Sequence, residues 1–133
     1  MPRDLSPIEL AKYRLEKAKE DLLTAKMSLE GGMLRGSVNR SYYAVFHAAR
    51  ALLALEGADY KKHVGVIAHF HREYVKTGLF DKTHGETISN AFVIRNEADY
   101  DDFYVLPKED AVEQLINAER FTDAVENYIK SQV

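Results

Sequence analysis

The fold is decided by residues 37–57, which read SVNRSYYAVFHAARALLALEG. When this segment is drawn as a helix of 3.6 residues per turn, apolar side chains stand on most of its sides. A helix with such a surface is buried at the centre of a bundle or against a partner molecule. We therefore expect a central helix from about Ser37 to Glu56 that ends at Gly57.

A long amphipathic helix is expected before this segment. Ser6 can cap its first turn, Pro7 suits that turn, and Glu9 completes a capping box. Apolar residues then recur three and four positions apart until Gly31-Gly32, namely Ile8, Ala11, Leu15, Ala18, Leu22, Ala25 and Leu29. This spacing predicts one helical face that packs closely against another long helix.

Further helices are expected after the central one. The pattern predicts a polar loop at 58–62, a helix over 63–76, a helix from near Thr83 to about Asp99, and a last helix opened by Pro107. Thr83 and Glu86 have the spacing of a capping box, and the acidic and aromatic residues 100–106 interrupt the helical pattern. Short connections make successive helices antiparallel. We predict a single all-α domain over residues 1–133, an up-and-down bundle of four to five helices.

Composition narrows the class of protein. The 133 residues carry 18 Lys and Arg against 21 Asp and Glu, a net charge of −3, so contact with nucleic acid must be local. The absence of cysteine excludes disulfides, thiolate metal sites and cysteine nucleophiles. The longest apolar runs, Tyr42–Phe46 and Ala51–Leu55, are far shorter than the roughly 20 residues of a membrane helix. The start, MPRDLSPIEL, lacks an apolar signal segment, so we expect a cytoplasmic protein without membrane contact.

The central helix carries its polar groups on one side. At about 100° per residue, an arc of roughly 100° holds Asn39, Arg40, Tyr43, His47 and Arg50. One interpretation is the solvated side of an amphipathic helix. The face contains neither Lys nor Glu, however, and the mixture of Asn, Tyr, His and Arg favours contact with a ligand, a nucleic acid or a partner.

A second polar face is expected at the end of the fourth helix, where Arg95, Asn96 and Asp99 stand within about 100° of one another. An Arg95–Asp99 pair at helical spacing would need no ligand. If the two faces meet, Arg40, Arg50 and Arg95 can hold phosphate with His47 or Tyr43 nearby.

No cofactor or metal site is predicted. His69 and His71 are two residues apart on a helix, so their side chains point about 200° apart and cannot share a metal ion. His63 follows Lys61 and Lys62 at a helix start, where it could cap the helix or contact solvent.

Three blocks of sequence resemble the HEPN family, the higher eukaryotes and prokaryotes nucleotide-binding domain. They are NRSYYAVFHAARALL at 39–53, KHVGV at 62–66 and RNEADY at 95–100. Their order and spacing are similar to the small stand-alone prokaryotic branch. The resemblance implies an all-α bundle that forms a homodimer and is often encoded beside a minimal nucleotidyltransferase as a toxin–antitoxin pair.

The resemblance also implies a site. Many such domains are metal-independent RNases whose motif is an Arg followed, after four to six residues, by a His, with a polar residue often directly after the Arg. Arg95 and Asn96 match the first two positions, whereas Tyr100, Asp101 and Asp102 stand where the His is expected. A phenol, with an ordinary pKa near 10, is a much weaker base at neutral pH than an imidazole. Arg40 and His47 have the motif's spacing but lie inside the central helix, so we expect weak or absent cleavage.

Two functions remain open from the sequence. The first is a toxin–antitoxin or defence-associated protein whose dimeric, Arg-rich cleft binds RNA or nucleotide, with Arg95 and either Tyr100 or His47 as the candidate catalytic residues. The second is a non-catalytic interaction subunit that pairs with a minimal nucleotidyltransferase. In both, the apolar surface of the central helix predicts self-association near the second and fourth helices.

Overall fold

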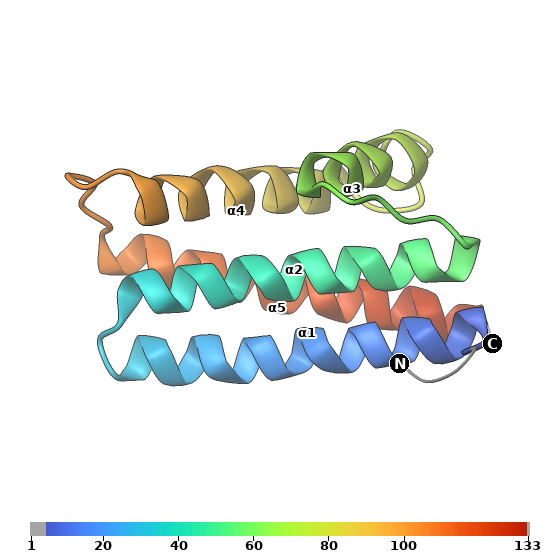
Figure 1. Ribbon diagram of the computed structural model, residues 1–133, viewed down its shortest axis with the longest axis horizontal. Helices are drawn as coiled ribbons and strands as arrows, with labels where there is room; N and C mark the ends of the chain where they lie inside the picture. Colours follow the sequence, from blue (N-terminus) through green and yellow to red (C-terminus); the bar gives the residue numbers. More distant parts are fainter. Residues whose placement is uncertain (1–4, 133) are drawn as a thin grey trace.

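The computed structural model describes residues 5–132, and the chain is all-α across that range. Its α-helices are α1 (Pro7–Glu30), α2 (Leu34–Glu56), α3 (His63–Phe70), α4 (Lys82–Tyr100) and α5 (Lys108–Ser131), with a π-helical turn, η1 (His71–Val75), directly after α3. Figure 1 shows that α1, α2, α4 and α5 alternate in direction. In the chain, α3 and η1 follow α2 and precede α4. The predicted all-α, up-and-down bundle is confirmed.

Helix α1 begins and ends where its sequence signals place it. The Glu9 amide donates to Ser6 Oγ at 3.2 Å, and the Ser6 amide donates to Glu9 Oε1 at 2.9 Å, so the capping box is formed. The helix packs mainly against α2, and its buried residues are small or apolar, namely Ala11, Leu15, Ala18 and Ala25. Small side chains at this seam allow the two helix backbones to approach closely.

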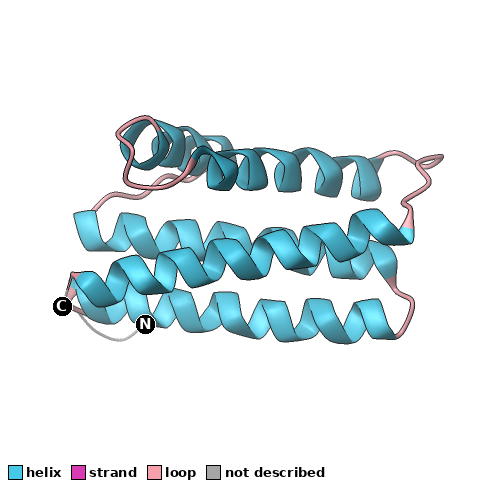
Figure 2. Ribbon diagram, turned by 180° about the vertical axis from the view of Figure 1, so that it is seen from behind, coloured by secondary structure: helices cyan, strands magenta, loops and turns pink. Residues whose placement is uncertain are grey.

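Helix α2 lies at the centre of the bundle and packs against α1, α4 and α5. It begins at Leu34 rather than at Ser37, because the Ser37 amide already donates to the Met33 carbonyl at 3.0 Å. The Ser37 side chain is buried, and its hydroxyl donates to the Ala25 carbonyl of α1 at 2.8 Å. Its end at Gly57, where φ is 75°, is as expected. Figure 2, from behind, shows the long helices side by side around it. The apolar faces of α2 are therefore covered within one chain.

Two further local predictions are wrong. The segment 63–76 is not one regular helix, since it passes into the wider turn η1, in which the Lys76 amide donates to the His71 carbonyl at 2.8 Å. Helix α4 begins at Lys82, because Asp81 rather than Thr83 is the cap: Asp81 Oδ2 accepts from the Thr83 amide at 3.0 Å. The Asp81 carboxylate caps the helix by accepting from the Thr83 amide. Thr83 then lies inside the first turn, where it cannot act as the cap of a capping box.

No helix within residues 5–132 combines the length and the apolar character that a membrane span requires.

Candidate functional site

The polar faces of α2 and α4 meet around one guanidinium. Arg95 Nη2 donates to the Tyr43 hydroxyl at 3.0 Å, and Arg95 Nε donates to Asn39 Oδ1 at 3.3 Å. On α4 itself, Arg95 Nη1 donates to Asn96 Oδ1 at 3.1 Å, and Arg95 Nε lies 3.3 Å from Asp99 Oδ2. We name these five residues the Arg95 cluster: Asn39, Tyr43, Arg95, Asn96 and Asp99.

The cluster holds the guanidinium against aromatic rings. Arg95 Cζ lies 5.2 Å from the centre of the Tyr42 ring and 5.4 Å from that of Tyr43. The α2–α4 contact is close because Ala91 and Ala98 of α4 are small and buried. Only 14% of the Arg95 side chain is exposed, and Asp99 is the one carboxylate paired with it among the described residues. The arrangement fixes the direction of a cation that is partly shielded from water.

His63, at the start of α3, joins this cluster from the side. Its Nδ1 lies 2.5 Å from the hydroxyl of the buried Tyr42, and its ring stacks on Phe46 with centres 4.1 Å apart. Burial, followed by the nearby charges of Arg95 and Arg50, lowers the pKa of His63. The imidazole is therefore neutral at pH 7. The sequence indicated a capping or solvent role for His63, with some added interest because it belongs to the 62–66 block that carries the family resemblance.

Arg40 and His47 gather at a different carboxylate. Arg40 Nη1 donates to Asp21 Oδ1 of α1 at 3.1 Å, and His47 Nε2 lies 3.7 Å from Asp21 Oδ2. Burial lowers the pKa of His47, and the opposing effect of Asp21 is smaller. Arg40 still borders the cluster, since its Cζ lies 5.9 Å from the Tyr43 ring. His47 lies at the α1–α2 contact, and its ring centre is 6.0 Å from that of Tyr43.

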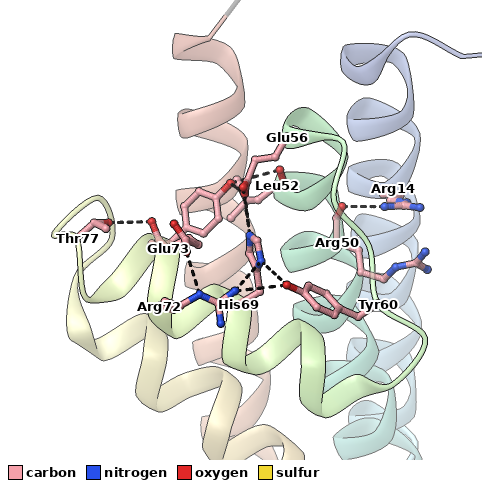
Figure 3. A network of polar contacts seen from close by, with 10 residues as sticks. Arg14, Arg50, Leu52, Glu56, Tyr60, His69, Arg72, Glu73 and Thr77 are labelled. Atoms are coloured by element: carbon pink, nitrogen blue, oxygen red, sulfur yellow. Dashed lines mark hydrogen bonds and ion pairs between the residues drawn. The ribbon is translucent and has the colours of Figure 1, made fainter.

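Arg50 lies further along α2, beside a surface depression. Its Nη2 donates to Asp59 Oδ2 at 2.9 Å. Its backbone carbonyl accepts from Arg14 Nη1 at 3.0 Å (Figure 3). The depression has a volume of about 450 Å³ and is lined by Phe46, Arg50, Asp59, Tyr60, Lys61 and His63. His63 thus stands between the Arg95 cluster and this depression.

Tyr100 does not join either group. It is the last residue of α4 and 75% exposed. Five residues along a helix correspond to a rotation of about 140° past a full turn, so the Tyr100 side chain leaves the helix on a different side from Arg95. The sequence-based set therefore divides in space into the Arg95 cluster, the Asp21 contacts, the Arg50 depression and the exposed Tyr100.

The described part of the chain contains no cluster of candidate metal ligands. Within residues 5–132, no three histidine or carboxylate side chains gather closely enough to hold a metal ion.

Comparison with known proteins places the chain in a family. The family model for the HEPN domain matches residues 11–128. A UPF0332 protein of Thermotoga maritima is 37% identical over 92% of this chain and 92% of its own length. A Methanocaldococcus jannaschii protein named as a candidate toxin is 37% identical over 87% of this chain and 86% of its own length. With its all-α bundle and a match across most of its length, the chain belongs to the HEPN domain family.

Proposed function

We propose that this protein is a toxin-like HEPN protein that binds the phosphate of RNA or nucleotide at the Arg95 cluster. Two relatives from Methanocaldococcus jannaschii that are named as candidate toxins support the toxin-like role. The observation that carries the binding role is the anchoring of Arg95 by Asn39 and Tyr43 on the neighbouring helix.

Neutral acceptors orient this guanidinium without cancelling its charge. The oxygens of Asn39 and Tyr43 fix its plane, and Asp99, a third of whose side chain is exposed, is the carboxylate that a phosphate would displace. A planar guanidinium held in this way offers paired N–H groups that match two phosphate oxygens. Arg40, with 46% of its side chain exposed, adds a second cation at the edge of the cluster.

We also propose that the protein acts as a homodimer in the cytoplasm. An apolar groove of about 310 Å³ between α3 and α4 is lined by Val64, Ile67, Ala68, Ser89, Phe92 and Val93. It begins one residue from His63 and ends two residues from Arg95. A second copy seated on this groove would bring its own cluster toward the first and form a shared cleft.

Replacing Arg95 tests the binding role. We expect Arg95→Ala to weaken binding of a labelled single-stranded RNA by about tenfold or more, because a charge-assisted bond contributes roughly 1.5–3 kcal/mol. Arg95→Lys should recover part of the loss, since it keeps the charge without the paired geometry. Arg120→Ala, at an exposed position on α5, is the matched control and should bind as the wild type does. Fluorescence anisotropy at low salt gives the Kd values, and wild-type affinity should fall as salt rises.

Absence of RNA and nucleotide binding by the wild type at low salt would contradict the proposal. It would favour the second function considered from the sequence, a non-catalytic subunit that partners a minimal nucleotidyltransferase.

A further inference from the structure

The depression beside Arg50 has the lining of a base-binding pocket. It combines three aromatic rings (Phe46, Tyr60 and His63), two cations (Arg50 and Lys61) and one carboxylate, Asp59. Its volume of about 450 Å³ lies within the range of small-molecule sites. Aromatic faces stack on nucleobases, while arginine and lysine bond to base edges and phosphates. We infer that this depression is a base subsite that prefers guanine over adenine, an inference that rests on the proposed phosphate site at Arg95.

Tyr60, one of the walls, is fixed before any ligand arrives. Its hydroxyl lies 2.9 Å from His69 Nδ1, and His69 Nε2 in turn lies 3.1 Å from Glu56 Oε2 at the end of α2 (Figure 3). The ring lies against Gly65, where an added Cβ would stand 2.9 Å from three Tyr60 carbons. The Arg72 guanidinium donates to the same hydroxyl at 3.4 Å. A wall held on two sides costs little conformational entropy when a base stacks on it.

The opposite wall connects the depression with the phosphate site. His63 stacks on Phe46, with centres 4.1 Å apart, and contacts Tyr42, whose ring lies beneath the Arg95 guanidinium. The base subsite and the Arg95 cluster are therefore adjoining parts of one surface. A nucleotide or a short RNA segment would place a base in one and a phosphate in the other.

The preference for guanine follows from which groups in the depression still have bonding capacity. Asp59 Oδ2 accepts from Arg50 at 2.9 Å and from Arg14 at 3.4 Å, and its Oδ1 accepts from the Tyr60 amide at 2.8 Å. Most of the hydrogen-bond acceptor capacity of Asp59 is therefore used by contacts within the protein. In contrast, Lys61 is exposed, and Arg50 Nη1 makes no hydrogen bond among the described residues. The depression thus presents mainly donors, which match O6 and N7 of guanine and oppose the N6 amine of adenine.

Binding of GMP, IMP and AMP tests the preference for guanine. GMP and IMP both carry O6 and N7, and IMP lacks only the exocyclic amine, whereas AMP carries an amine in place of O6. We expect calorimetry to give similar Kd values for GMP and IMP and a Kd about tenfold weaker for AMP. Equal affinity for GMP and AMP, or an IMP affinity that matches AMP, would overturn the guanine preference.

Variants locate the preference in the depression. Lys61→Gln should reduce the ratio of GMP to AMP affinity toward one, while Lys62→Gln, the neighbouring exposed lysine, should leave it unchanged. Arg95→Ala should weaken all three nucleotides by a similar factor and preserve the ratio. A ratio that Lys61→Gln leaves intact would also overturn the inference.

The same measurements keep the two proposals apart. If Arg95→Ala weakens all nucleotides but GMP and AMP bind alike, the phosphate site stands and the base subsite is contradicted. If the wild type binds none of them and no RNA, both are contradicted. Short single-stranded RNAs that differ by one G or A show whether the preference extends from free nucleotides to RNA.

Discussion

The Arg95 side chain is held in place by hydrogen bonds to residues of the neighbouring helix α2, and this distinguishes it from the other candidate catalytic residues. Asn39 and Tyr43 reach it from α2, so its position depends on the packing of two elements. His47 faces Asp21 of α1 with only 17% of its side chain exposed. Tyr100 is exposed and leaves α4 on another side. Among the three residues proposed as catalytic from the sequence, only Arg95 is held by hydrogen bonds to residues of both α2 and α4.

This separation leads to a prediction about RNA cleavage. We expect purified protein to leave total RNA intact, or to cut it slowly, at pH 7 in EDTA, because His47 faces Asp21 and Tyr100 leaves α4 on a different side from Arg95. Loss of a positioned general base typically removes about 100- to 10,000-fold of rate. Any residual cleavage should depend on His63, the imidazole that contacts the tyrosine beneath Arg95. His63→Ala should then abolish cleavage, while His47→Ala and Tyr100→Phe retain it.

Electrophoresis and analysis of the RNA ends check this expectation. Rapid, Arg95-dependent fragmentation that leaves 2′,3′-cyclic phosphates would contradict it. If Tyr100 were the base, cleavage would instead rise toward alkaline pH, because a phenol has an ordinary pKa near 10.

The sequence could predict that the α2 and α4 polar faces each exist, since helical periodicity alone assigns their residues to one side. It could not predict which of those residues join the Arg95 cluster and which pair with carboxylates elsewhere. Arg40 and Arg50 lie on the same face as Asn39, yet they pair with Asp21 on α1 and Asp59 in the α2–α3 loop. Asp21 belongs to another helix and Asp59 to a loop, and helical periodicity does not indicate which carboxylate faces which arginine. His63 was underestimated for the same reason, because its partner Tyr42 belongs to the apolar part of α2.

Among the secondary-structure elements, α2 has two roles. Its apolar faces supply the centre of the core, and its polar face and C-terminal end supply both proposed subsites. The end of α2 matters because the loop that follows carries Asp59, Tyr60 and Lys61. Gly57 turns the chain there with a φ of 75°, a conformation that strains any residue with a side chain.

Two glycine substitutions test this role of the α2 end. Gly57→Ala should lower the free energy of unfolding by about 1–2 kcal/mol, because an L residue is strained in the left-handed region. Gly31→Ala, at the end of α1, should change it by less than about 1 kcal/mol, since φ there is −85° and the nearest atom to an added Cβ lies at 3.5 Å. Urea unfolding compares the two variants, and equal losses would contradict a special role for the Gly57 turn.

The presence and order of the helices could be predicted from the sequence. Apolar periodicity and N-terminal caps such as Ser6 depend on residues that are close together in the chain. The start of α2 could not, because its N-cap is Met33, which makes no side-chain capping bond that the sequence could reveal. The π-helical turn after α3 had no distinguishing pattern either. Its buried Tyr74 stacks on Phe70, with centres 5.8 Å apart, and both rings pack in the core.

For the whole molecule, the structure changes the reason to expect a dimer. The sequence-based expectation rested on an α2 too apolar for one chain to cover, but α1, α4 and α5 cover it. Apolar surface instead remains on α3 and α4, where Val64 is 56% exposed and Val93 is 53% exposed. Figure 1 shows these helices along one side of the bundle, opposite α1. The dimer stays a prediction, and its expected interface moves to the α3–α4 groove.

A charge placed in that groove tests the prediction. We expect light scattering to give a dimer for the wild type and a monomer for Val64→Glu and Val93→Glu, because an unpaired carboxylate is costly to bury in an apolar interface. Val105→Glu, at an 82% exposed position in the α4–α5 connection, is the matched control and should stay dimeric. A stable interface needs about 1,000 Å² of buried surface or more, so the groove must be the centre of a larger contact. A wild type that is monomeric across micromolar concentrations would contradict the dimer. Groove variants that remain dimeric would place its interface elsewhere, and the Arg95 clusters of two copies would then have no structural reason to share a cleft.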